Sequence, residues 1–232
     1  MQPLVLASGN AGKLRELSVL LADKSFSLIT QASLGIAACP EPHHTFIENA
    51  LEKARHAAKH SGYPALADDS GICVPALGGA PGVLSARYAQ SLISLPTVFS
   101  IPTLTSILTP TPTPTPTPTL TIRSEAAPVD ALSSIDQQNN LALLSQLGRP
   151  LTPAYYYCVL VFVRFANDPQ PIIAQGDWQG AVIHEARGAG GFGYDPYFYV
   201  ASENQTVAQM SAEKKNHLSH RAKALRALLA LL

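Results

Sequence analysis

The sequence predicts an α/β protein, because strand and helix patterns alternate near the N-terminus and two long strands follow later. Residues 3–31 show the order strand, helix, strand. Two longer apolar segments, at residues 154–166 and 171–186, have the length and composition of paired strands. With 232 residues, the chain is long enough to bury a full core.

The N-terminal unit begins with an apolar run at residues 3–8, continues with helical periodicity at 12–21 and ends in an apolar run at 26–31. A second helix begins at Thr45. The spacing T-F-I-E is typical of a capping box, in which Thr45 caps the first turn and Glu48 reaches back. The face of this helix that we expect to be buried consists of Ile47, Ala50, Leu51, Ala54 and Ala58.

The later elements follow the same logic. The stretch PALADDSGICV at residues 64–74 predicts a buried strand, a polar turn and another strand. Residues 136–147 have a helical pattern, and the long strands are expected to connect through a turn at Asn167–Gln170. The chain closes with a helix whose apolar stripe consists of Leu218, Ala222, Leu225, Leu229 and Leu232.

Residues 90–134 interrupt this pattern. The repeat TPTPTPTPTPT at residues 109–119 has proline at every second position, which removes backbone donors and excludes both helix and sheet interior. We therefore expect a single domain spanning residues 1–232, with a Thr/Pro-rich low-complexity insertion at residues 90–134. A partner-binding arm is the alternative interpretation of this segment.

The charge balance argues against partners that are attracted by the net charge of the whole protein. Lysine plus arginine equals aspartate plus glutamate at 16 each, so neither nucleic acid nor an acidic membrane is an expected partner. The three cysteines lack zinc-site spacing and suit a reducing cytoplasm. The N-terminus lacks a signal-peptide pattern, and the uncharged stretch Ser91–Leu108 contains prolines that make it a poor spanning helix.

The first candidate site is the stretch Ser8-Gly9-Asn10-Ala11-Gly12-Lys13. It joins a strand to a helix, so free backbone N–H groups and the positive end of the helix dipole meet there. Lys13 adds a mobile positive charge. The spacing differs from that of a Walker loop, so the stretch alone indicates an anion site or a plain strand-to-helix turn.

The second candidate site is acidic. Glu41 lies in CPEPHHTF, and Asp68, Asp69 and Ser70 follow a buried apolar run. Buried carboxylates are costly unless they are paired or bind a metal, and hard oxygen ligands suit Mg²⁺. A turn in which aspartate acts as a cap is the alternative.

Two further candidates lie near the C-terminus. In GAGGFGYDP, residues 188–196, glycines flank Phe192 and Tyr194, so backbone and an aromatic face are available to a flat heterocycle. The helical stretch SAEKKNHLSHRAKAL concentrates positive charge. Packed aromatics and a solvated helix face are the respective alternatives. Together, the four candidates predict a site for a magnesium-bound nucleotide.

Five ordered segments resemble the inosine triphosphate pyrophosphatase family: LASGNAGKLREL, TFIENALEKARHAAKHSG, LADDSGICVPALGGAPGVLSARYA, GGFGYDPYF and EKKNHLSHRAKAL. The resemblance covers nearly the whole chain apart from the insertion. It implies an elongated mixed β-sheet with flanking helices, in two lobes around a nucleotide cleft, and a homodimer. It also implies Mg²⁺-dependent hydrolysis of ITP, dITP and XTP to the monophosphate and pyrophosphate.

The resemblance also assigns roles to residues. The stretch from Ser8 to Lys13 would hold the triphosphate, with Asn10 and Lys13 as side-chain contacts. Glu41 and Asp69 would bind Mg²⁺, and Asp69 would also be the catalytic carboxylate. The remaining substrate contacts would be Ser70, Phe192, Gly193, Tyr194, Asp195, Lys215, His220 and Arg221, with Phe192 stacking on the base.

Other functions remain to be tested against this one. A non-hydrolytic nucleotide-binding or regulatory module would keep the cleft and use the Thr/Pro arm for partners. A nucleic-acid-binding protein built on the basic C-terminal helix would need a basic domain, which the charge balance argues against. A pyrophosphatase for modified pyrimidine nucleotides would differ mainly in the size of its base pocket.

Overall fold

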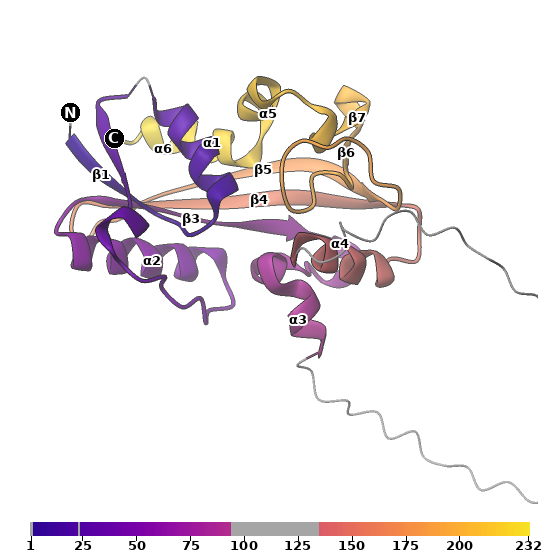
Figure 1. The fold of residues 1–232 in the computed structure, drawn as a ribbon, viewed down its shortest axis with the longest axis horizontal. Helices are drawn as coiled ribbons and strands as arrows, with labels where there is room; N and C mark the ends of the chain where they lie inside the picture. The colour runs from indigo at the N-terminus through magenta and orange to yellow at the C-terminus, as the bar shows by residue number, and fades with distance from the viewer. Residues whose placement is uncertain (1, 23, 94–134) are drawn as a thin grey trace, which may run out of the picture.

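The computed structural model describes residues 2–22, 24–93 and 135–232, and its described strands form one seven-stranded mixed sheet (Figure 1). The strand order is β2-β1-β3-β4-β5-β6-β7. β1 is parallel to β2 and β3, and the other neighbours are antiparallel. The strands are β1 Gln2–Ala7, β2 Phe26–Thr30, β3 Ala65–Cys73, β4 Leu151–Val163, β5 Ile172–Ile183, β6 Phe198–Val200 and β7 Gln205–Thr206.

Helices cover both faces of the sheet. In Figure 1, α1, α5 and α6 lie on one side of the sheet and α2, α3 and α4 on the other. The α-helices are α1 Ala11–Leu21, α2 Phe46–Ser61, α3 Tyr88–Ile93, α4 Ile135–Ser145, α5 Ala212–Leu218 and α6 His220–Leu229. The short 3-10 helices are η1 Ala32–Leu34, η2 Pro75–Leu77, η3 Gly82–Arg87, η5 Ala201–Glu203 and η6 Val207–Gln209.

Successive side chains along a strand point to opposite faces of the sheet, so part of the core lies on each face. In β1, Leu4 and Leu6 pack with α1 and α6, whereas Val5 packs against α2. Alanines on α2 let it lie close to the sheet. A third cluster, at the other end of β4 and β5, gathers Ile72, Tyr156, Trp178, Phe198 and residues of α4. The core therefore has two ends joined by long strands, as the expected two-lobed α/β fold requires.

Most predicted elements are confirmed, including the N-terminal unit, the long hairpin and the helix at α4. At α2, the Thr45 hydroxyl accepts from the Glu48 N–H at 3.2 Å, and its proton is donated to the Glu48 carboxylate at 2.6 Å. Ile47 was wrongly expected to be buried: it is 37% exposed and precedes the small-residue stripe that meets the sheet.

Two predictions about elements are wrong. The stretch at residues 64–74 is one continuous strand rather than strand, turn and strand, because β4 pairs with it from Ala65 to Cys73. The C-terminal helix is two helices, α5 and α6, separated at Ser219. Leu232 lies beyond α6 and is exposed, while Leu228 takes its place in the core.

The expected insertion lies largely outside the described residues. Residues 90–93 belong to α3, and residues 94–134 are outside the described part of the chain. Within the described ranges, none of the helices combines the length and apolar character needed to cross a membrane.

Candidate active site

The main cavity lies where β1 ends and β3 continues. β1 pairs with β3 through Ala67, whereas β3 runs on beside β4 to Cys73. The chain leaves β1 for α1 on one face of the sheet and leaves β2 for α2 on the other. Such a switch point at the carboxyl end of a parallel strand favours ligand binding. The cavity there measures about 580 Å³ and is lined by all the predicted site residues except Ala11 and Gly12.

The anion turn joins β1 to α1. Asn10 caps α1, because its Oδ1 accepts from the Lys13 N–H at 3.0 Å, and its own N–H donates to Ser8 Oγ at 3.2 Å. These contacts fix the turn so that the N-terminus of α1 faces the cavity. At Gly12, a Cβ atom would lie 2.5 Å from the Phe192 ring. Glycine is therefore required for this turn to lie against the aromatic side chain.

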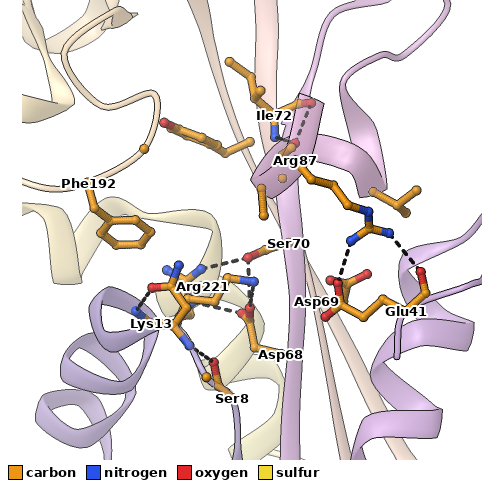
Figure 2. A pocket seen from close by; sticks show the side chains of 18 of the residues that line it. Ser8, Lys13, Glu41, Asp68, Asp69, Ser70, Ile72, Arg87, Phe192 and Arg221 are labelled. Carbon is orange, nitrogen blue, oxygen red and sulfur yellow. Dashed lines mark hydrogen bonds and ion pairs between the residues drawn. The ribbon is translucent and has the colours of Figure 1, made fainter. Parts of the chain in front are cut away.

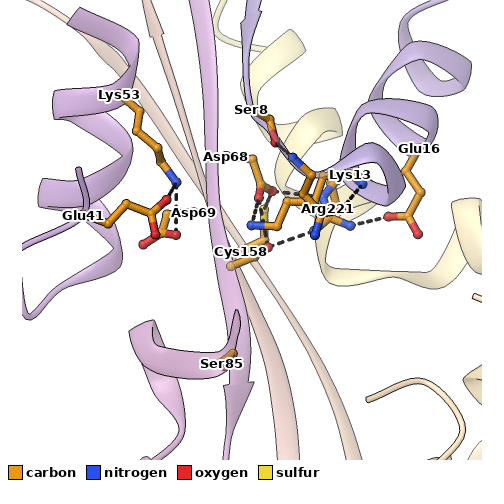
Figure 3. A network of polar contacts seen from close by, with 12 residues as sticks. Ser8, Lys13, Glu16, Glu41, Lys53, Asp68, Asp69, Ser85, Cys158 and Arg221 are labelled. Carbon is orange, nitrogen blue, oxygen red and sulfur yellow. Dashed lines mark hydrogen bonds and ion pairs between the residues drawn. The ribbon is translucent and has the colours of Figure 1, made fainter. Parts of the chain in front are cut away.

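Adjacent aspartates on β3 point to opposite faces of the sheet (Figure 3). Asp68 points toward α1 and α6, where Lys13 Nζ lies 2.5 Å from Oδ1 and Arg221 Nε lies 2.9 Å from Oδ2. The Cys158 thiol also donates to Oδ2 at 3.1 Å. Burial opposes ionisation of Asp68, but Arg221 and Lys13 hold its pKa well below the ordinary value. Asp68 is therefore an ionised anchor for the two cations.

Asp69 points toward α2. The Lys53 ammonium donates to Asp69 Oδ1 at 3.2 Å and to Glu41 Oε1 at 2.6 Å. Arg87 holds Glu41 from the other side, with Nη1 3.2 Å from Oε2 (Figure 2). Burial raises the pKa of Asp69 despite Lys53, whereas Lys53 outweighs burial and lowers the pKa of Glu41. Lys53 thus holds two carboxylates from distant parts of the sequence side by side.

This pair of carboxylates fits a hard divalent cation. The buried Asp69 Oδ2 has no hydrogen-bond partner among the described residues, and an unpaired buried carboxylate oxygen is costly. Oxygen donors with room for water and phosphate oxygens are typical of Mg²⁺ sites. In the described ranges no group of three or more His, Cys, Asp or Glu forms a metal cluster, so the protein would supply few of the ligands.

The aromatic shelf, residues 192–195, lies opposite these carboxylates. The Lys215 ammonium is 4.5 Å from the centre of the Phe192 ring, a distance suited to a cation–π contact. Asp195 Oδ2 accepts from Lys215 Nζ at 2.5 Å and from the Phe192 N–H at 2.9 Å. Burial raises the pKa of Asp195 although Lys215 opposes it. Tyr194 is buried and its hydroxyl donates to the Ser85 carbonyl at 2.8 Å, so this ring anchors the shelf.

The start of α6 closes the cavity between shelf and anion turn. Arg221 is 1% exposed, and its guanidinium donates to Ser70 Oγ at 2.8 Å in addition to Asp68. His220 stacks on Tyr156 with ring centres 4.7 Å apart. Burial, reinforced by Arg221, holds the pKa of His220 well below its ordinary value. Its ring is therefore neutral at physiological pH, and Nδ1 lacks a hydrogen-bond partner within the described chain.

Among the site residues that the sequence interpretation did not identify are Glu16 and Lys53. Glu16 accepts from Lys215 at 2.8 Å and from Arg221, and Lys53 joins Glu41 to Asp69. Both looked like ordinary charges on helix surfaces. The available signals were the spacing of Glu16 three residues after Lys13, which places both on one helix face, and a lysine within the alanine stripe of α2.

The sequence is similar to those of known proteins. The dITP/XTP pyrophosphatase of Chromobacterium violaceum is 46% identical over 230 residues, covering 99% of this chain and 96% of the relative. The dITP/XTP pyrophosphatase of Nitrosomonas europaea is 44% identical over 233 residues, covering 100% and 95%. The expected resemblance is thereby confirmed.

Solved structures show the same fold. A HAM1 protein from Coxiella burnetii has a TM-score of 0.73 and 35% identity, covering 100% of this chain and 98% of the other. The Ham1 protein of Staphylococcus aureus has a TM-score of 0.70 and 30% identity, covering 99% and 97%. The model of the Ham1 family matches residues 4–97 and 124–231. This chain belongs to the Ham1 family.

Proposed function

We propose that this protein is a Mg²⁺-dependent pyrophosphatase that hydrolyses ITP, dITP and XTP to the nucleoside monophosphate and pyrophosphate, and so removes them from the nucleotide pool. One observation carries the proposal. A single cavity is lined by the anion turn, by the carboxylates of Glu41 and Asp69, and by the shelf at Phe192. These are the parts needed to hold a triphosphate, its metal and its base at once.

The triphosphate would lie along the N-terminus of α1. Backbone N–H groups of residues 8–13 and the helix dipole favour negative charge there. Lys13 sits against Asp68 in the free protein, 15% exposed, and would turn toward the leaving pyrophosphate. Ser70 Oγ, oriented by Arg221 and Asp68, would contact the substrate.

The reaction needs a water molecule placed in line with the bond that breaks. Water attacks the α-phosphorus, the bond from that phosphorus to the bridging oxygen breaks, and pyrophosphate leaves. Asp69 Oδ2, which has no hydrogen-bond partner among the described residues, would orient the water and accept its proton. When bound by Glu41 and Asp69, Mg²⁺ supplies neutralisation of the phosphate charge and favours ionisation of water.

Base choice would depend on donors around the shelf. Hypoxanthine and xanthine present an acceptor at position 6, where adenine presents an amino donor. Lys215, held over Phe192 by Asp195 and Glu16, carries donors only. A pocket of donors excludes adenine because both partners would be left unpaired.

Further proposals concern the whole protein. We place it in the cytoplasm, since its three cysteines are free and free thiols suit a reducing compartment. The family resemblance supports a homodimer. A single domain with a Thr/Pro-rich insertion is supported by the one continuous sheet of the described residues.

The test is pyrophosphate release from ITP, dITP, XTP, ATP and GTP, with and without Mg²⁺. We expect metal-dependent release from the first three nucleotides. Asp69→Asn should lower kcat by at least about 10²-fold while circular dichroism stays unchanged. Lys223→Ala is the matched control, because this exposed side chain contacts only the Asp177 carbonyl among the described contacts.

Two other outcomes would overturn the proposal. Nucleotide binding without pyrophosphate release, by a protein shown to be folded, would establish the non-hydrolytic module instead. Equal release from ATP and ITP would exclude the base selectivity.

A further inference from the structure

The backbone at Gly193, at the centre of the aromatic shelf, is held on both sides by α4. Its N–H donates to Asp136 Oδ2 at 2.9 Å, and its carbonyl accepts from Asn140 Nδ2 at 2.9 Å. Asn140 is 5% exposed, and the same Nδ2 also donates to the Asp136 carbonyl at 2.8 Å. Two side chains one helical turn apart therefore hold Gly193 through the two peptide groups that flank its Cα.

Gly193 needs such support. Its φ of +61° lies in the left-handed region, and glycine pays a large entropic cost when it is fixed there. A Cβ at this position would meet nothing within 4 Å among the described residues, so no described side chain packs against Gly193 from that side. The two hydrogen bonds from α4 select the conformation that sends Phe192 toward the anion turn and Tyr194 into the core.

The helix that holds the shelf is itself tied to the opposite wall of the cavity. Asn139 Nδ2 donates to the Ala86 carbonyl at 3.0 Å, and Asn139 Oδ1 accepts from the Ala89 N–H at 2.9 Å. Those residues lie at the junction of η3 and α3, beside Arg87, which holds Glu41. The α4 helix thus sets the position of the shelf relative to the carboxylates.

We propose that Asp136 and Asn140 are positioning residues that fix the backbone at Gly193 and thereby set affinity for the nucleobase, with a much smaller effect on the phosphate site. This inference rests on the proposed function. It predicts that loss of these hydrogen bonds weakens base binding much more than pyrophosphate binding, since in the described part of the chain Lys13 and the anion turn are held by Asn10 and Asp68 rather than by α4.

The experiment measures binding of IMP and of pyrophosphate to the full chain by calorimetry in Mg²⁺. Asp136→Ala and Asn140→Leu each remove one hydrogen bond to Gly193, whereas Asp136→Asn keeps an acceptor. The matched control is Gln138→Ala, an exposed position of the same helix outside the cavity lining. Circular dichroism and thermal unfolding check the fold of each variant.

We expect Asp136→Ala and Asn140→Leu to weaken IMP binding about tenfold and to leave pyrophosphate binding within about twofold. Asp136→Asn should restore IMP binding to near the wild-type value, and Gln138→Ala should change nothing. In steady-state hydrolysis, KM for ITP should rise about tenfold with kcat nearly constant. A rise in KM without loss of kcat separates positioning of the base from general damage.

Two results would overturn the inference: unchanged IMP binding in both disruptive variants, or equal weakening of IMP and pyrophosphate. Should Asn140→Leu fail to fold, the comparison of Asp136→Ala with Asp136→Asn decides. If the wild-type protein binds neither probe, both the proposed function and this inference are refuted. If it binds both, the variants test the role of α4 separately from the proposed function.

Discussion

Gly12 shows how one side chain's absence shapes the site. Alanine in a helix is ordinarily more favourable than glycine by about 1 kcal/mol. Here the added Cβ would lie 2.5 Å from Phe192, and overpacking costs about 1–3 kcal/mol. We expect Gly12→Ala to lower the free energy of unfolding by about 1 kcal/mol in urea titrations and to raise KM for ITP. Gly9→Ala, where a Cβ meets no described residue within 4 Å, should leave stability unchanged.

Replacing Lys53 should lower the stability of the folded protein and make that stability depend more strongly on Mg²⁺. Removing one partner of a buried charge cluster destabilises by about 3–5 kcal/mol, and Lys53 is 8% exposed between Glu41 and Asp69. We expect Lys53→Met to lower the free energy of unfolding by about 3 kcal/mol in EDTA.

Added Mg²⁺ should restore part of that loss, because a cation between the carboxylates replaces the missing ammonium. Thermal unfolding with and without Mg²⁺ measures both effects. Lys59→Met, at an exposed position of the same helix, should match the wild-type protein in both measurements, with a smaller Mg²⁺ effect than Lys53→Met. Equal Mg²⁺ effects on all three proteins would contradict the assignment of this cation site.

At the scale of residues, the sequence predicts those parts of the site whose functional side chains are neighbours in the sequence. The turn at residues 8–13, the acidic pair and the shelf are each recognisable as short stretches, and the cavity brings them together. Glu16 and Lys53 were missed because their partners lie far away in sequence: Glu16 meets Arg221, and Lys53 meets Glu41. A single charged residue on a helix does not reveal which distant charge will reach it.

Among the elements, the division between α5 and α6 positions the basic residues. Ser219 ends α5, donating its N–H to the Lys215 carbonyl at 2.9 Å, and caps α6 by accepting from the Ala222 N–H at 3.2 Å. Losing an N-cap costs about 1 kcal/mol.

We therefore expect Ser219→Ala and Ser211→Ala, which removes the cap of α5, to lower the free energy of unfolding by similar amounts. Only Ser219→Ala should also lower kcat/KM for ITP, because His220 and Arg221 follow it directly. Equal effects of both substitutions on kcat/KM would show that the cap does not position Arg221.

His220 at the first turn of α6 makes stability depend on pH. Burial and Arg221 lower its pKa in the folded protein, so below its unfolded pKa of about 6.5 the unfolded chain binds the additional proton. Stability is then lost as pH falls below this value, by up to about 1.4 kcal/mol per pH unit.

We expect the free energy of unfolding to fall between pH 7.5 and 5.5, and the slope to decrease in His220→Gln. Chemical denaturation at each pH gives this slope. His217→Gln, at an exposed position of α5, is the control. The difference between the two variants gives the contribution of His220 to the pH dependence of the free energy of unfolding. Asp195 contributes in the opposite direction, because its raised pKa stabilises the folded state as the pH falls.

The elements that the sequence mispredicted were decided by tertiary pairing. Asp-Asp-Ser-Gly has turn composition, yet it continues β3, because Lys13 and Arg221 neutralise Asp68 on one face and Lys53 contacts Asp69 on the other. Conversely, the apolar periodicity through residues 218–232 suggested one helix. That apolar run contains Ser219, which caps α6 and changes the direction of the chain.

For the whole molecule, we expect one cooperative unfolding transition, because the two ends of the core share the continuous strands β4 and β5. Calorimetric and van't Hoff enthalpies should agree. Removing residues 98–123, which the match to the Ham1 family leaves out, should change neither the number of transitions nor KM for ITP. Two separate transitions in the wild-type protein would contradict a single domain.

The opposite orientations of Asp68 and Asp69 make strand alignment a determinant of chemistry. If β3 slipped by one residue against β4, every side chain would exchange faces, and Asp69 would meet Arg221 while Asp68 met Lys53. The two carboxylates would then exchange partners, and each would lie one residue along the strand from its present position relative to Glu41 and the anion turn. The pairing from Ala65–Val163 to Cys73–Tyr155 thus gives the two neighbouring carboxylates their different surroundings, and we expect an insertion of one residue in β3 to inactivate the protein although every proposed site residue is kept.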